Sequence, residues 1–256
     1  MTITYIYDGS FEGFLTCVFN AYEMKMMQVN IVREVLFQNT FFGTNEVVVT
    51  DKEKANRVWK GLKKKITTNE LRRFYYAFLS ELPTVENTLF NAITYVFNTK
   101  YNVASNFTNK HVLDIAKLTK NVSREKHRME AFVRFKLTKD NIYFANIEPD
   151  FNVLPLISKH FEKRYADQKW LIYDLLRNYG IYYNLEKVEI VNLELNKNFD
   201  ATKTSSAIFT AIELEFQQLW KDYFKSTNIA SRKNMKLHTQ HVPKRYWKYL
   251  SEKEVF

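Results

Sequence analysis

The stretch AFVRFKLTKDNIYFANI, residues 131–147, decides the fold class because apolar residues change their spacing there. Up to Met129 they recur at helical spacing. From Ala131 to Leu137 apolar and polar residues alternate, which is the period-two pattern of a half-buried strand. Ile142 to Ile147 repeats the extended pattern after the turn-forming residues 139–141. A β-hairpin that follows a helix predicts a protein that mixes helices with antiparallel strands.

Strand–helix units precede the hairpin. Ile3 to Tyr7 is predicted as a strand, and a helix follows with apolar residues from Phe11 to Phe19. Val47 to Val49 predicts a second strand, with a helix after it. Capping signals mark two helix starts, Thr50-x-x-Glu53 and Thr67-x-x-Glu70, and a further helix covers 85–97. This order favours parallel pairing through right-handed crossovers.

Further elements follow the hairpin. They are a helix over 154–161, a strand over 170–175, a hairpin of 181–183 with 188–195, and a long amphipathic helix over 208–223. The predicted fold is therefore α+β, with a mixed sheet, strand–helix units at the N-terminus, antiparallel hairpins in the middle and a helical C-terminal region.

Composition limits the classes of protein. Five Gly and four Pro in 256 residues favour one compact unit over 1–256, with two lobes, 1–105 and 106–256, as the alternative. Cys17 is the single cysteine, so we expect no internal disulfide, no Cys-based metal site and no cofactor. No apolar run approaches the ~18 residues of a membrane span. We expect a cytoplasmic protein without membrane contact.

The positive charge is concentrated at the C-terminus. Residues 221–256 hold nine Lys or Arg and three acids, which is +6 of the net +10. Clusters of this kind bind phosphates, although a solvated basic tail is the alternative. Three rings in the run, Tyr246, Trp247 and Tyr249, favour an ordered surface for nucleic acid. The candidate contact residues are Arg232, Lys233, Lys236, Lys244, Arg245, Trp247 and Lys248.

The middle of the chain supplies candidates for a catalytic site. On a strand, Phe132, Arg134 and Lys136 would share one face and could hold a base and its phosphate. Asp174, three residues before Arg177, is either an acid in a site or half of a buried ion pair, and Arg134 is an alternative partner for it. The catalytic candidates are His127, Arg134, Asp174 and Arg177, with His160, Arg164 and Trp170 as further lining of a shared pocket.

The known catalytic motifs are absent from the sequence. It has no Gly-rich phosphate loop, no nucleophile elbow and no zinc-deaminase pattern, and no metal site is expected. The residue pattern therefore leaves open whether the protein is an enzyme.

Five motifs occur together over essentially the full length: Tyr5-x-Tyr7-Asp8-Gly9-Ser10-Phe11-Glu12-Gly13, His127-Arg128-Met129-Glu130-Ala131-Phe132-Val133-Arg134-Phe135, Pro149-Asp150-Phe151 with His160-Phe161 and Arg164, Asp167-Gln168-x-Trp170-Leu171-Ile172-Tyr173-Asp174, and Pro243-x-Arg245-Tyr246-Trp247. Together they resemble a family of bacterial DNA metabolism or repair proteins encoded beside a radical-SAM protein. In some members this region is fused to a uracil-DNA-glycosylase-like domain, which has no counterpart in these 256 residues. The resemblance implies a DNA context and a radical-SAM partner, and it assigns no catalytic residues.

Three hypotheses follow. The first is a DNA repair or DNA metabolism protein that binds nucleic acid and acts with a radical-SAM partner. The second is an enzyme that processes a base or nucleotide in a His/Arg/Asp pocket. The third is a scaffold whose basic segment docks a partner without touching DNA. Convergence of His127, Arg134 and Asp174 in one pocket would favour the enzyme.

Overall fold

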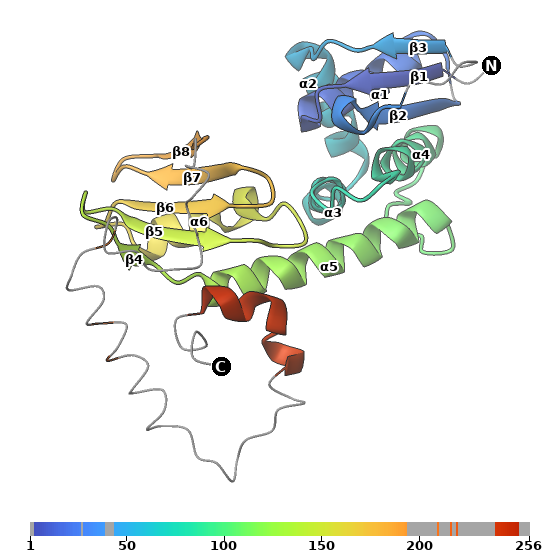
Figure 1. Ribbon diagram of the computed structural model, residues 1–256. Helices are drawn as coiled ribbons and strands as arrows, with labels where there is room; N and C mark the ends of the chain where they lie inside the picture. Colours follow the sequence, from blue (N-terminus) through green and yellow to red (C-terminus); the bar gives the residue numbers. More distant parts are fainter. Residues whose placement is uncertain are drawn as a thin grey trace. The chain divides into compact units, whose positions relative to one another are not determined.

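The computed structural model describes residues 3–26, 28–38, 44–193, 209, 216, 219 and 239–250. Over these residues the chain is α+β, as the sequence predicts. It divides into two compact units, Met1–Ser123 and Arg124–Phe256. The first unit contains a three-stranded parallel sheet and the second a five-stranded mixed sheet (Figure 1).

The sheet of the first unit has β1 (Ile3–Tyr7) in its centre. This strand pairs in parallel with β2 (Val29–Arg33) on one side and with β3 (Thr44–Val47) on the other. Parallel strands need a crossover, and α1 (Phe11–Glu23) supplies the one from β1 to β2. The predicted parallel pairing is confirmed, whereas β2 is a strand that the sequence patterns miss.

The two predicted helix caps have different outcomes. Thr67 and Glu70 form the predicted capping box at the start of α3 (Thr68–Phe78). Thr50 does not cap α2 (Lys52–Lys65), the helix that follows it, because its hydroxyl donates to Asp8 Oδ2 at 2.8 Å. Asp51 takes the capping position and accepts from two amides of the first turn. The other helices of this unit are η1 (Glu34–Leu36), α4 (Val85–Asn98) and α5 (Lys110–Phe132), which continues past the boundary at Ser123.

An aromatic cluster joins three helices of the first unit. The Phe11 ring lies 5.3 Å from the Trp59 ring and 5.1 Å from the Tyr75 ring, both edge-on. It also lies 5.0 Å from the ring of Phe78. Edge-to-face pairs at such separations stabilise by about 0.5–1.5 kcal/mol each beyond the area they bury. These contacts join α1 to α2 and α3.

The second unit is built on a sheet in the order β4-β5-β6-β7-β8 (Figure 1). β5 and β6 run parallel, and α6 (Leu154–Arg164) connects them. The other neighbouring pairs are antiparallel, which confirms the predicted hairpins in the middle of the chain. The strand bounds are β4 (Lys136–Leu137), β5 (Tyr143–Ile147), β6 (Trp170–Asp174), β7 (Tyr179–Tyr183) and β8 (Val188–Val191).

The first predicted strand of the hairpin is much shorter than the sequence predicts. α5 extends through Phe132, and the Val133 amide still donates to the Met129 carbonyl at 3.2 Å. Arg134 then ends the helix by donating to the carbonyl of Ala131 at 2.8 Å. Only Lys136–Leu137 pairs as a strand. The alternation predicted a longer strand because the same apolar residues also fit the last turn of a helix.

The C-terminal region is described in part. The predicted helix over 208–223 lies outside the described residues except for Phe209, Phe216 and Leu219, and Phe209 forms an isolated bridge with Thr138. A 3-10 helix, η3 (Lys244–Tyr249), follows. Within the described parts of the chain, no helix is both long enough and apolar enough to cross a membrane.

Candidate phosphate-binding site

The carboxyl ends of β5 and β6 bring two loops side by side in the second unit. Glu148, Pro149 and Asp150 leave β5, and the turn 175–178 leaves β6 at Asp174. Ligands of open sheets with parallel strands bind outside this end, because the loops diverge there and leave room. The carboxyl ends of β5 and β6 are therefore a candidate ligand-binding position.

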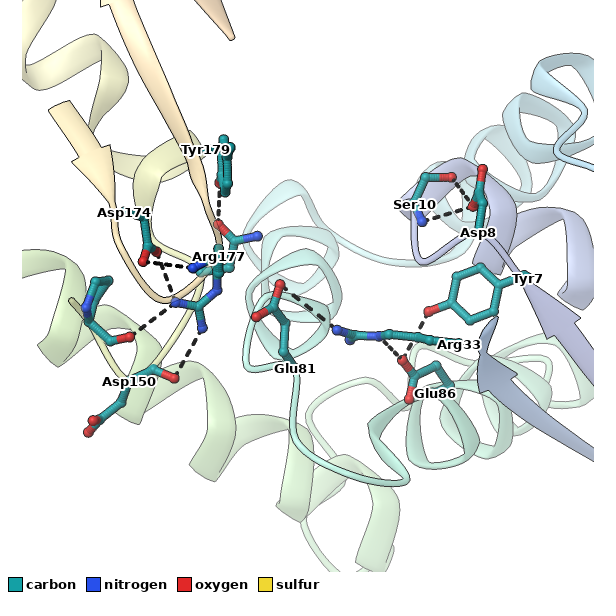
Figure 2. Close-up of polar contacts among 12 residues, drawn as sticks. Tyr7, Asp8, Ser10, Arg33, Glu81, Glu86, Asp150, Asp174, Arg177 and Tyr179 are labelled. Atoms are coloured by element: carbon teal, nitrogen blue, oxygen red, sulfur yellow. Dashed lines mark hydrogen bonds and ion pairs between the residues drawn. The ribbon is translucent and has the colours of Figure 1, made fainter. Parts of the chain in front are cut away.

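Asp174 and Arg177 join these two loops (Figure 2). Asp174 has no exposed surface, and its carboxylate accepts from the Arg177 guanidinium at 2.9 Å and from the Leu176 amide at 2.9 Å. The same guanidinium donates to the carbonyls of Pro149 at 3.1 Å and Asp150 at 3.2 Å. Burial raises the pKa of Asp174 although Arg177 acts in the opposite direction. The pair is the buried ion pair of the two alternatives drawn from the sequence.

The C-terminal helix η3 is anchored on the same loops. Tyr246 is 2% exposed, and its hydroxyl donates to Glu125, which is 1% exposed. Arg245 Nη2 lies 3.3 Å from Glu125 Oε2 and 2.6 Å from Asp150 Oδ2. Burial, together with the hydrogen bond to Glu125, raises the pKa of Tyr246 above its ordinary value. The basic segment is thus an ordered part of this unit over 239–250.

Glu148 receives the other end of η3. Lys248 Nζ lies 2.5 Å from Glu148 Oε2, and the Tyr249 hydroxyl donates to the same oxygen at 2.7 Å. These two hydrogen bonds lower the pKa of Glu148. The side chains of Lys248 and Glu148 are 49% and 36% exposed, so water competes for this pair and its net stabilisation is small.

An open hollow of about 530 Å³ lies between the loops and η3. It has three cations and two carboxylates on its walls, a balance of +1. Lys244 has no ion-pair partner among the described residues. Arg245 pairs with Asp150, and Lys248 pairs with Glu148. Lys248 also lines a narrow neighbouring pocket with Arg134 and Lys136. The lining of the hollow is Glu148, Pro149, Asp150, Leu176, Lys244, Arg245 and Lys248.

This arrangement can bind an anion by exchange. A phosphate that approaches Lys244 can replace the half-exposed carboxylates as partner of Arg245 and Lys248, and the guanidinium fork suits two phosphate oxygens. Such pairs are bidentate and charge-assisted, which makes them stronger than neutral hydrogen bonds.

The seven residues proposed for a catalytic pocket do not meet at one place, although Arg177 lies 2.9 Å from Asp174. Trp170 is fully buried at the start of β6, where its ring stacks on Tyr183 at 5.5 Å. Asp174 ends the same strand, about 13 Å away at ~3.3 Å per residue. Arg134 caps α5, and Arg164 is exposed beside the Tyr165 ring. Alternation predicted correctly that Trp170 and Asp174 share a strand face, but it gives no distance along the strand.

The two histidines lie near a carboxylate that the sequence did not single out. His127 is 87% exposed, and its Nδ1 is 3.8 Å from Glu130 Oε2. His160 Nδ1 is 3.8 Å from Glu130 Oε1, an oxygen that also accepts from Lys126 Nζ at 2.6 Å. The histidines are therefore partners of Glu130 and not of Arg134 or Asp174. Among the described residues no group of three or more His, Cys, Asp or Glu side chains could hold a metal ion.

The predicted contact residues of the tail divide into two groups. Arg232, Lys233 and Lys236 lie outside the described residues. The second group, Lys244, Arg245, Trp247 and Lys248, lies on η3. Trp247 is partly buried, and its indole N–H donates to the Val242 carbonyl at 3.0 Å, so the ring helps to shape the segment.

The sequence missed the acids of the site. Glu125, Glu148 and Asp150 are the partners of the tail, and no local pattern connects them with residues about a hundred positions later. The sequence also missed a buried cluster in the first unit, where Tyr7 donates to Glu86 at 2.9 Å and Arg33 Nε donates to the same carboxylate at 2.7 Å (Figure 2). That cluster ties the start of α4 to β1 and β2.

Residues 83–252 match a domain of unknown function, DUF4130. The chain belongs to the DUF4130 family. The match contains α4, α5, all strands of the second unit and η3, whereas β1 to β3 and α1 to α3 precede it. No curated protein matches the chain.

Among solved structures, a pGpG-specific phosphodiesterase, PggH from Vibrio cholerae, is similar to this DUF4130 protein. The similarity covers 71% of this chain and 80% of that one, with 9% sequence identity and a TM-score of 0.29. A likeness at this TM-score supports no inference about fold or function.

Proposed function

We propose that this DUF4130 protein binds DNA through phosphate contacts from Lys244, Arg245 and Lys248. The observation that carries the proposal is that the most basic part of the sequence is seated, over 239–250, at the carboxyl ends of β5 and β6, where its cations line an open hollow. Each phosphate that a cation neutralises releases counterions, and this release drives binding.

The tail rings have structural roles in this proposal. Tyr246 is buried against Glu125, so it offers no face to a base. The Tyr249 hydroxyl is occupied by Glu148. Binding through phosphates without base stacking is insensitive to sequence.

Salt-dependent binding of duplex DNA tests the proposal. Replacement of Lys244, Arg245 and Lys248 by Gln should make the slope of log affinity against log salt shallower by up to about 3, at ~0.9 per phosphate contact. Lys244→Gln alone should account for about 0.9 of this, because its charge has no acid to release. Lys187→Gln serves as control. Lys187 is paired with Glu189 at 2.7 Å and does not line the hollow. An unchanged slope in a folded triple variant would refute the proposal.

A role in DNA metabolism beside a radical-SAM partner is the wider proposal. It is supported by the family resemblance of the motifs and by the cysteine count, since Cys17 is the single cysteine, is buried and cannot ligate an iron–sulfur cluster alone. The resemblance implies a radical-SAM protein encoded beside this one, and we expect the two purified proteins to bind each other when mixed. Gel filtration of the mixture, with each protein alone as control, checks this, and separate elution would contradict it.

A docking scaffold is the second candidate. The observation that favours it is the pairing of Arg245 and Lys248 with carboxylates, which reduces the charge available to DNA. The same salt titration separates the two functions, because a scaffold shows no salt-dependent affinity for duplex DNA. The pocket enzyme is disfavoured, because Asp174 has no exposed surface and is paired with Arg177, while His127 contacts Glu130 and Arg134 lies at the end of α5.

A further inference from the structure

Helix α2 is the most basic helix of the first unit. Between Lys52 and Lys65 it carries seven Lys or Arg and a single acid, Glu53. It lies outside the residues that match the DUF4130 family, 83–252, so its charge is a property of the preceding part of this chain. The charge count of the sequence analysis drew attention to the tail and passed over this helix.

Two of the seven cations donate hydrogen bonds to neighbouring elements, and a third, Arg57, lies over the Phe19 ring with its guanidinium carbon 4.7 Å from the ring centre. Lys54 Nζ donates to Asn20 Oδ1 at 3.0 Å and to Glu23 Oε2 at 3.1 Å. Lys65 Nζ donates to the carbonyls of Phe97 and Thr99, both at 2.8 Å. These bonds use two charges to hold α2 against its neighbours.

The other five cations, Lys52, Arg57, Lys60, Lys63 and Lys64, are exposed and have no ion-pair partner among the described residues. At ~100° per residue, the last four lie within one side of the helix, opposite the buried Ala55, Val58 and Leu62. We call Arg57, Lys60, Lys63 and Lys64 the α2 basic face.

The α2 basic face differs from α5 in that none of its cations is ion-paired among the described residues. On α5 three of the six Lys and Arg residues pair with acids at helical spacing: Lys117 with Asp114 at 3.8 Å, Lys126 with Glu130 at 2.6 Å and Arg128 with Glu125 at 3.4 Å. On the α2 basic face cations follow one another at i+3 and i+4, and each like-charge pair destabilises the helix. The helix macrodipole offsets part of this cost for the last turn. A polyanion would remove the remainder.

We propose that the α2 basic face is a second binding surface, which contacts the phosphate backbone of duplex DNA. Fourteen residues make a helix of about 21 Å, and duplex DNA carries one charge per ~1.7 Å of its axis, so several phosphates come within reach of the face. The four residues of the face include no ring, and the one aromatic residue of the helix, Trp59, packs on Phe11. Contacts are therefore to phosphates, without stacking on single-stranded bases.

An anionic membrane is a poorer partner for this helix. Membrane-surface helices insert an apolar face into the lipid, and the apolar face of α2 is used in the core through Ala55, Val58 and Leu62. The α2 basic face can therefore contribute charge alone.

The test compares two triple variants of the full chain. Lys60→Gln with Lys63→Gln and Lys64→Gln removes three charges from the face and keeps good helix formers. Lys100→Gln with Lys110→Gln and Lys139→Gln removes three exposed, dispersed charges and leaves the net charge of the two variants equal. Fluorescence anisotropy with labelled duplex DNA over a range of NaCl gives the slope for each, and circular dichroism checks that both are folded.

We expect the slope of log affinity against log salt to become shallower by about 2–3 in the face variant and by less than 1 in the dispersed variant. Equal changes of slope in the two variants would overturn the inference, and so would an unchanged slope in the face variant. Binding of the wild type to vesicles of phosphatidylserine and phosphatidylcholine, without binding to duplex DNA, would overturn it as well. The inference rests on the proposed function in the sense that both require DNA. The Lys244, Arg245 and Lys248 variant, run alongside, separates them, because either surface can lose its effect while the other keeps it.

Discussion

At the scale of single residues, Asp174 depends on one guanidinium. Replacing Arg177 by Met leaves a carboxylate with no exposed surface and removes the counter-ion at 2.9 Å. Loss of one partner of a buried pair costs about 3–5 kcal/mol. Urea denaturation at neutral pH should show a loss of this size. The loss should shrink as the pH falls and Asp174 becomes neutral, and a pH-independent loss would contradict the account.

Glu70 gives a second prediction at this scale. Burial alone would raise its pKa, but hydrogen bonds from Asn102, Thr67 and Ser105 outweigh burial and lower the pKa to about 2. A carboxyl group depressed in the folded state stabilises the protein above its unfolded pKa, and this contribution disappears as the pH falls toward 2. Linkage makes the contribution roughly 3 kcal/mol.

The variant Glu70→Gln should therefore be less stable than the wild type at pH near 7, with the difference closing between about pH 4.5 and 2. Thermal unfolding of both proteins across this range measures it. Parallel curves for the two proteins would show that the charge of Glu70 has no stabilising role.

At the scale of elements, η3 is held by its rings. The indole of Trp247 bonds to the Val242 carbonyl at 3.0 Å, and Tyr246 is buried beneath the segment. Trp247→Ala should lower the melting temperature of the second unit's transition, because removal of a packed Trp costs up to about 3–5 kcal/mol and less where the ring is partly exposed. Calorimetry checks this. An unchanged melting temperature with weaker DNA binding would mean that the ring stacks on a base.

The strand β7 depends on Gly180. A Cβ there would lie 2.8 Å from the Ile172 carbonyl oxygen and 2.9 Å from the Tyr173 ring. The first of these is backbone of the paired strand β6 and cannot move without breaking the ladder. Gly180→Ala should therefore destabilise by about 1–3 kcal/mol, although alanine ordinarily reduces the entropy of the unfolded chain. Gly61→Ala, in α2, is the control and should be near neutral, because Gly61 is partly buried and the nearest neighbour of an added Cβ is a side-chain atom, on the Phe97 ring at 3.3 Å.

At the scale of the whole molecule, the net charge of +10 is divided between surfaces. If the α2 basic face and the η3 cations contact the same duplex independently, a variant that combines both sets of substitutions should lose the sum of the two slopes, up to about 5. A titration of the combined variant against NaCl measures this. A loss no greater than that of one set would show that only one surface engages DNA at a time.

The patterns that the sequence carries are local, and what they determined is local as well. Residue periodicity predicted the α+β class and most helices. The spacing of Thr67 and Glu70 predicted a capping box. Alternation placed Trp170 and Asp174 on one face. These features depend on neighbours within a turn or a strand, where the backbone period alone brings side chains together.

Partners distant in sequence were decided by the tertiary structure. Asp174 pairs with Arg177 and not with Arg134, because Arg134 is used to end α5. Arg245 meets Glu125 and Asp150 only because η3 docks where β5 ends. The distribution of charge in the sequence determined that a basic segment exists. It did not determine which acidic side chains or ligands pair with that segment. Coulomb attraction falls with distance and solvent exposure, so only the folded chain decides which charges remain available to a ligand.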